Sequence, residues 1–111
     1  MSDRPLLEVV ADDDEEIIKA LKNMGVSRIV AFTPEKIVYQ YPPAGDVLDL
    51  KAFASSALAI MNEVDPWLAL KQGSRSVIIF KKDGIVVAVE GVLAPVDYDA
   101  IVMLARILSF E

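Results

Sequence analysis

Residues 48–64, with the sequence LDLKAFASSALAIMNEV, contain the pattern from which the fold of this chain can be worked out. Apolar residues recur there at the three-and-four spacing that places them on one face of a helix, which we expect to be buried. That face comprises Leu50, Phe53, Ala54, Ala57, Leu58, Met61 and Val64. The opposite face carries the small, uncharged residues Ala52, Ser55, Ser56 and Ala59, between Lys51 and Glu63. Because an outward helix face without charge is typically covered by another structure, we expect it to be an interface.

The composition favours one folded domain with few options for chemistry. A chain of 111 residues is long enough to bury about two thirds of its unfolded surface. The absence of cysteine and histidine excludes disulfides, thiolate or imidazole metal ligands, and catalysis by cysteine or histidine. We therefore expect a protein that is not an enzyme and that uses no cofactor. The apolar fraction of 54% is high for a soluble domain and favours an oligomer.

Charge is concentrated in one short run. The formal net charge is −6, and residues 12–16 (DDDEE) supply five of the seventeen acids. The rest of the chain is nearly neutral and has no cluster of Lys and Arg, so neither nucleic acid nor an anionic membrane is an expected partner. No apolar run approaches the roughly 20 residues that span a bilayer, and the start lacks the pattern of a signal peptide. We expect a cytoplasmic protein without membrane insertion.

Turn and cap residues divide the rest of the chain into helices and strands. Residues 13–24 are expected to form a helix that an Asp caps and Gly25 ends. Asp46 or Asp49 is expected to cap the central helix, and Pro66 marks its far end. A last helix is expected from Tyr98 to about residue 110, with Asp97 as its cap.

Strands are expected over residues 28–32, 36–41, 67–71, 75–81 and 85–93. Asp83-Gly84 lies between two β-branched runs, which is the strongest short hairpin signal. The runs VIIF at residues 77–80 and IVVAV at residues 85–89 are apolar on both sides of the pleat, as in strands that helices cover on both faces.

The predicted fold is α+β: a single antiparallel five-stranded sheet with helices on both faces, in the order helix, two strands, helix, three strands, helix. Residues 67–71 (WLALK) are expected at an open edge of the sheet. Residues 1–12 are expected to be an N-terminal tail or arm, in which residues 5–10 form either an extra edge strand or an arm packed on the body. Residues 13–111 form the domain itself.

This order of elements, together with three local features, resembles the Roadblock (dynein light-chain) family of small dimeric adaptors with a profilin-like and longin-like fold. The features are the Gly25-Val26 step, the Ala-rich helix followed by NEVDPW at residues 62–67, and QGSRSVIIFKKDGIVVAVEG at residues 72–91. The resemblance spans residues 13–111. It departs at residues 33–36 (TPEK), where members of the family often carry Asp and Gly in the turn.

The resemblance implies a homodimer in which the second helix and third strand of two subunits meet around a two-fold axis. On this chain the implied interface comprises Ala52, Ser55, Ser56, Ala59, Ile60, Trp67, Leu68, Ala69, Leu70 and Lys71. The resemblance also implies a non-catalytic scaffold that binds or regulates a small Ras-like GTPase, or that belongs to a larger protein assembly, with Lys51 and Glu63 reaching the partner. The residues alone favour a similar interface, because small side chains allow close helix approach and an uncovered edge invites a symmetric partner.

Other patterns allow both a functional and a structural interpretation. The acids of residues 12–16 provide oxygens for a divalent cation or an exposed start to a helix. Four basic residues near the ends of the last two hairpins either form a basic patch for a phosphate or an acidic partner, or they protect the strand ends. They are Lys71, Arg75, Lys81 and Lys82. Three aromatic residues either line a ligand pocket or fill a core or an interface. They are Tyr39, Tyr41 and Trp67. We favour the structural interpretation of each, and keep a small-ligand sensor or carrier of profilin-like fold as the alternative function.

Overall fold

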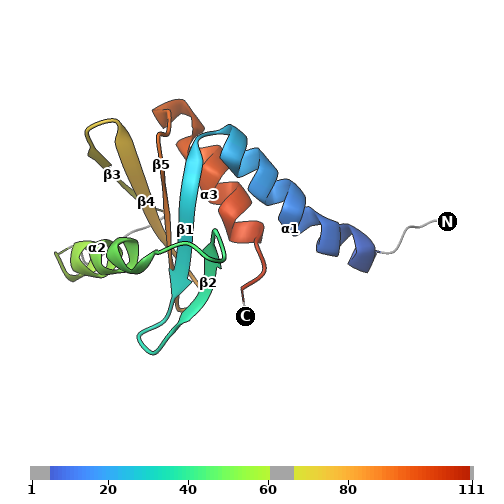
Figure 1. The fold of residues 1–111 in the computed structure, drawn as a ribbon, viewed down its shortest axis with the longest axis horizontal. Helices are drawn as coiled ribbons and strands as arrows, with labels where there is room; N and C mark the ends of the chain where they lie inside the picture. Colours follow the sequence, from blue (N-terminus) through green and yellow to red (C-terminus); the bar gives the residue numbers. More distant parts are fainter. Residues whose placement is uncertain (1–5, 61–66, 111) are drawn as a thin grey trace.

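The structure is a computed structural model that describes the backbone of residues 6–60 and 67–110 and the side chains of residues 14–59 and 67–110. The elements follow one another in the predicted order (Figure 1). They are α1 (Leu6–Asn23), β1 (Val26–Phe32), β2 (Ile37–Tyr41), α2 (Leu48–Ile60), β3 (Leu68–Gln72), β4 (Arg75–Lys82), β5 (Ile85–Gly91), the short 3-10 turn η1 (Pro95–Asp97) and α3 (Tyr98–Ile107).

The five strands form one antiparallel sheet in the spatial order β2-β1-β5-β4-β3, so β2 and β3 are its two edges. This confirms the predicted edge strand, shifted by one residue from 67–71 to Leu68–Gln72. The β4–β5 hairpin turns at Asp83 and Gly84, whose φ angles are 51° and 81°. Asn, Asp and Gly are the residues that tolerate positive φ, which is why the Asp-Gly pair predicts this hairpin.

Helices cover both faces of the sheet, as expected (Figure 1). The α1 and α3 helices pack on one face around a core of Ile17, Leu21, Val26, Ile29, Ala31, Ile78, Phe80, Val87, Val89, Leu93, Ile101, Val102, Ala105 and Leu108. The α2 helix packs on the other face around Val30, Phe32, Val47, Leu50, Ala54, Ala57, Val77, Ile79 and Ala88. Successive residues of β4 enter opposite cores, with Ile79 and Phe80 both fully buried. Burying each such side chain contributes about 1.5–3 kcal/mol, so the central strands hold both layers together.

The first helix is longer than predicted. It begins at Leu6, so residues 6–10 are helical and the expectation of an extra strand there is wrong, whereas the alternative of an arm packed on the body stays a prediction. No Pro or Gly occurs from Leu6 to Asn23 to interrupt a helix, and residues 12–16 therefore lie inside α1 rather than at its cap. Its predicted end is confirmed, because Gly25 follows with φ of 101°.

The central helix begins as predicted. The backbone N–H of Leu48 donates to Asp46 Oδ1 at 3.1 Å, so Asp46 rather than Asp49 supplies the cap. Of the expected inward face, Leu50, Ala54 and Ala57 are buried and Leu58 is half-buried. Phe53 is 39% exposed, which corrects its assignment to the buried face. Residues 61–66, with the predicted end of this helix at Pro66, lie outside the described residues.

The start of α3 and the β1–β2 turn differ from the predictions in the hydrogen bonds that form them. Asp97 precedes α3 without any side-chain hydrogen bond to it, because a 3-10 turn already occupies this position, so its expected role as a cap is wrong. The β1–β2 turn closes through Thr33, whose Oγ1 accepts the backbone N–H groups of Glu35 and Lys36 at 3.3 and 3.2 Å. That hydroxyl closes a turn that contains no glycine. None of the helices in the described ranges combines the length and hydrophobicity that crossing a membrane requires.

Candidate functional site

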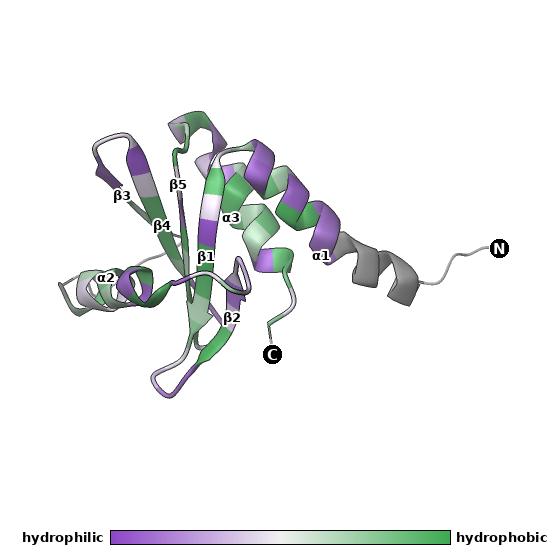
Figure 2. Ribbon diagram, in the orientation of Figure 1, coloured by the Kyte–Doolittle hydropathy of each residue, from purple (hydrophilic) through white to green (hydrophobic). Residues whose placement is uncertain are grey.

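The outward face of α2 is exposed and uncharged beyond its first turn (Figure 2). It presents Ala52, Phe53, Ser55, Ser56 and Ala59, each classed as exposed. By contrast, the exposed side chains on the described part of α1 are all charged or polar, namely Glu15, Glu16, Lys19, Lys22 and Asn23. The chain therefore places charged cover on α1 and leaves the exposed face of α2 without charge beyond its first turn, although both helices lie on the outside of the sheet.

A groove joins this face to the edge strand β3. It has a volume of about 460 Å³ and is lined by Phe53, Leu70, Lys71, Gln72, Arg75, Val77 and Glu90. Leu68 and Leu70 pair with Ile79 and Val77, which places them on the α2 side of the sheet. Of the predicted interface residues, Leu70 and Lys71 therefore line this groove beside Phe53 of α2.

Two of the predicted interface residues on β3 and next to it face the other way. Trp67 packs edge-on against Tyr98, with ring centroids 5.8 Å apart, and its Nε1 donates to Asp99 Oδ1 at 3.1 Å. Ala69 packs on the same core as Trp67, beneath α3. Only their backbones, at or near the sheet edge, are available on the α2 side.

The predicted partner-binding residues are described only in part. Lys51 is half-buried, and its ammonium lies 5.3 Å from the centre of the Phe32 ring. This cation–π contact holds the Lys51 side chain against the protein. The side chain of Ile60 and all of Glu63 lie outside the described residues.

A network of ion pairs around Arg28 fixes α2 on the sheet. The guanidinium donates to both carboxylate oxygens of Asp49 at 2.7 and 3.0 Å, and its Nε donates to Glu90 at 2.6 Å. It also donates to the carbonyl of Asp46, just before α2. Hydrogen bonds from Arg28 lower the pKa of both Asp49 and Glu90, and these two carboxylates raise the pKa of Arg28. Our sequence reasoning missed this network, although a lone Arg in the apolar strand RIVAF indicates a charge that needs partners.

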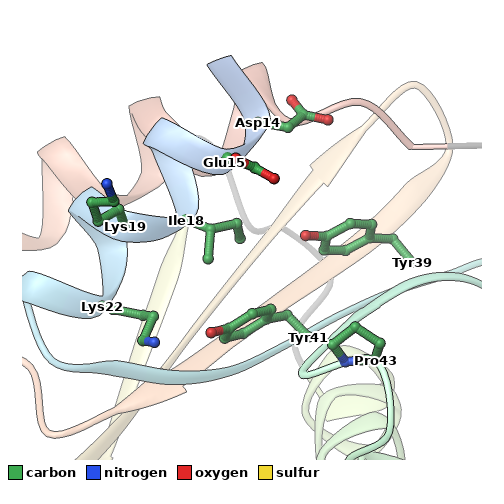
Figure 3. Close-up of a pocket in the computed structure, with 8 residues that line it drawn as sticks. All are labelled: Asp14, Glu15, Ile18, Lys19, Lys22, Tyr39, Tyr41 and Pro43. Atoms are coloured by element: carbon green, nitrogen blue, oxygen red, sulfur yellow. The ribbon is translucent and has the colours of Figure 1, made fainter. Parts of the chain in front are cut away.

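A second and larger groove lies at the opposite edge of the sheet, between β2 and α1 (Figure 3). Its volume is about 530 Å³, and it is lined by Asp14, Glu15, Ile18, Lys19, Lys22, Tyr39, Tyr41 and Pro43. Figure 3 shows Tyr39 and Tyr41 side by side, with their rings directed toward α1. Burial, and secondarily the charge of Asp14, raises the pKa of Tyr39.

This arrangement divides the three aromatic residues that the sequence analysis grouped. Tyr39 and Tyr41 line the β2–α1 groove, whereas Trp67 lies beside Tyr98 next to the other edge strand. Sequence alternation places the two tyrosines on one face of β2, but it does not indicate that α1 leaves a groove above them. A single pocket made of all three residues is therefore excluded.

The four basic residues of the last two hairpins do not gather into a patch. Lys82 donates to the carbonyls of Arg106 and Leu108 and lies 4.9 Å from the centre of the Phe110 ring. Arg75 donates to Ser27 Oγ at 2.7 Å. These contacts favour the structural interpretation of the basic residues. Among the residues whose side chains are described, no group of three acids is arranged to hold a metal ion.

Comparison of the chain with models of known protein families gives no match, and comparison with curated protein sequences gives none either.

Proposed function

We propose that this chain is a non-catalytic interaction module that forms a homodimer through the outward face of α2 and the edge strand β3. The observation that carries the proposal is the uncharged, exposed surface formed by Ala52, Ser55, Ser56 and Ala59 beside the groove at Phe53 and Leu70. Phe53 and Leu70 leave apolar surface in water beside this face, and in the proposed dimer a second copy covers it.

The chemistry of the two elements suits a two-fold axis. The small side chains of α2 let two helix backbones approach closely, and β3 has one row of N–H and C=O groups that no strand among the described residues pairs. Antiparallel pairing of β3 with its copy satisfies those groups and continues the sheet from one subunit into the next. Lys71, at the exposed end of β3, then lies at the rim of the interface.

Light scattering coupled to size exclusion tests the dimer. The wild-type chain is expected to elute with twice the monomer mass at micromolar concentration, and Ala59→Arg is expected to elute as a monomer because it introduces a charge at the helix crossing. Ala100→Arg is the matched control, since Ala100 is an exposed helical alanine on α3, on the other side of the sheet. A monomeric wild-type chain, or a dimeric Ala59→Arg variant, would contradict the proposal.

The resemblance to Roadblock adaptors extends the proposal to a partner, a small Ras-like GTPase bound by the dimer. Support for this step comes from the resemblance alone. Affinity capture with the wild-type chain, in lysate supplemented with GDP or with a non-hydrolysable GTP analogue, is expected to recover a Ras-like GTPase in one nucleotide state more than in the other. Recovery of none removes the GTPase but leaves the dimer standing.

A further inference from the structure

The β2 edge of the sheet combines two features that recognise an extended chain. As an edge strand, β2 has backbone N–H and C=O groups on its outer side that no strand among the described residues pairs. The groove between β2 and α1 runs alongside these groups. Peptides that add a strand to an exposed edge obtain affinity from the main chain and specificity from alternate side chains that enter such a groove.

The floor and walls of the groove suit one apolar side chain. Ile18 and Pro43 supply apolar contacts, and Tyr39 and Tyr41 supply two half-buried rings. Among the described residues, neither of these tyrosine hydroxyls has a hydrogen-bond partner, so both remain available to a ligand. The ring of Tyr39 also packs against the ring of Phe110, with centroids 5.4 Å apart, which helps to hold the groove wall in place.

The rim of the groove changes sign along its length. Asp14 and Glu15 lie toward Tyr39, whereas Lys22 lies toward Tyr41 (Figure 3). Eight residues separate Asp14 from Lys22 along α1, a distance of about 12 Å at the helical rise. A strand covers about 13 Å in four residues, and its alternate side chains point the same way. Because α1 runs obliquely to β2 (Figure 1), the two ends of the rim lie at most this far apart along β2, within reach of the long side chains of Lys and Glu four residues apart on an extended peptide.

From this match we propose that the β2–α1 groove binds an extended segment of a partner protein that pairs with β2. Its alternate side chains are a basic residue beside Asp14 and Glu15, an apolar or aromatic residue between the two tyrosines, and an acidic residue beside Lys19 and Lys22. The site does not depend on the proposed dimer, because β2 and β3 are opposite edges of the sheet.

Capped heptapeptides test the proposal directly. The probes are acetyl-Thr-Lys-Thr-Phe-Thr-Glu-Thr-amide, its counterpart with Lys and Glu exchanged, and a neutral counterpart with Thr at both positions. Because the peptide runs either parallel or antiparallel to β2, one of the two charged probes matches the rim and the other opposes it. The matching probe is expected to bind about fivefold tighter than the opposing one, with the neutral probe between them. Amide chemical-shift changes are expected in Ile37–Tyr41 and along α1 from residue 14 to residue 22.

Two further measurements separate strand pairing from simple occupation of the groove. N-methylation of the alternate peptide residues whose N–H groups face β2 is expected to abolish binding, and N-methylation of the intervening residues is expected to preserve it. Lys22→Glu is expected to reduce the preference for the matching probe, whereas Lys81→Glu, an exposed lysine on β4, leaves the preference unchanged.

Several outcomes overturn the proposal. One is the failure of every probe to bind at millimolar concentration, and another is equal affinity of the two charged probes. Equal loss of binding on N-methylation at either set of positions excludes pairing with β2. If N-acetyl-phenylalanine amide binds as tightly as the matching peptide, the groove is a site for a small ligand. Shifts confined to β3 assign the peptide to the other edge.

Discussion

At the scale of single residues, Arg28 links β1 to β5 and to the start of α2. It lies on a strand that is otherwise almost wholly apolar, and 24% of its side chain remains exposed. Its partner Glu90 is only 13% exposed, whereas Asp49 is 69% exposed. Because the desolvated carboxylate of Glu90 depends on this guanidinium, the Arg28–Glu90 pair is worth more to stability than the exposed Arg28–Asp49 pair.

Arg28→Ala is therefore expected to lower the free energy of unfolding by about 1–3 kcal/mol, because Glu90 then lacks its main partner. Arg75→Ala is the matched control. Its side chain is 48% exposed and its nearest nitrogen lies 3.5 Å from Glu90, so a loss below about 1 kcal/mol is expected. Urea denaturation of both variants at neutral pH measures the difference. Equal losses would show that the shorter Arg28 contacts do not dominate.

The same network predicts how stability depends on pH. Hydrogen bonds from Arg28 hold the pKa of Glu90 below its ordinary value of 4.5 and that of Asp49 below 3.8. The unfolded chain thus binds more protons than the folded chain as these carboxylates titrate, so stability is fully present above these ordinary values and declines as the pH falls below them. Glu90→Gln is expected to reduce this decline. Urea midpoints measured above and below these values test it, and a decline as steep as in the wild-type chain would assign the effect to other groups.

At the scale of elements, the end of α1 and the end of β5 meet through two glycines. A Cβ on Gly91 would overlap the carbonyl oxygen of Gly25 and lie 2.9 Å from Val26 Cα. The contact is between backbones, so no side chain can move to relieve it. The backbone N–H of Val92 also donates to that Gly25 carbonyl at 3.2 Å, which locks the junction between β1 and β5.

Gly91→Ala is accordingly expected to destabilise the fold by at least about 3 kcal/mol, because an added methyl group forces the two strands apart. Gly73→Ala is the control. Gly73 has a φ of 65° but no atom within 4 Å of an added Cβ, so only the backbone conformation opposes the change, at about 1 kcal/mol. Thermal unfolding of the two variants compares them. Similar losses would mean that the junction yields easily.

Most elements were predictable from local chemistry, and the errors concerned the start of α1, the cap of α3 and the exposure of Phe53. Asp83-Gly84 fixes a hairpin by its backbone preferences. The spacing of apolar residues alone indicates which face of α2 is directed toward the sheet. The start of α1 was misjudged because acids at residues 12–16 resemble a cap, although nothing before them prevents a longer helix. The prediction that Asp97 caps α3 failed for a related reason, since capping depends on side-chain geometry that a residue type does not determine.

The candidate sites differ in the same way, because one follows from a local sequence pattern and the others join segments that are distant in the sequence. The exposed face of α2 follows from one periodic stretch, so the sequence reveals it. The β2–α1 groove joins residues 14–22 to residues 39–43, and its rim charges acquire meaning only when the two elements are placed together. Likewise, the Arg28 network spans β1, α2 and β5, which no local pattern connects.

At the scale of the whole molecule, the strand order assigns the two candidate surfaces to opposite ends of the sheet. The sheet ends in β3 beside α2 on one side and in β2 beside α1 on the other. A dimer formed through β3 therefore leaves β2 of each subunit open. Such an assembly presents two identical peptide grooves, one at each end of a continuous sheet.

This arrangement predicts that the two surfaces act independently. Ala59→Arg is expected to change the mass of the assembly without changing the affinity of the matching heptapeptide by more than about twofold, because no described residue lines both grooves. Titration of the wild-type dimer and of the monomeric variant, followed at the amides of β2, measures the two affinities. Loss of peptide binding in a folded monomer would instead place part of the β2 site on the partner subunit, and would mean that the dimer builds the groove rather than merely carrying two copies of it.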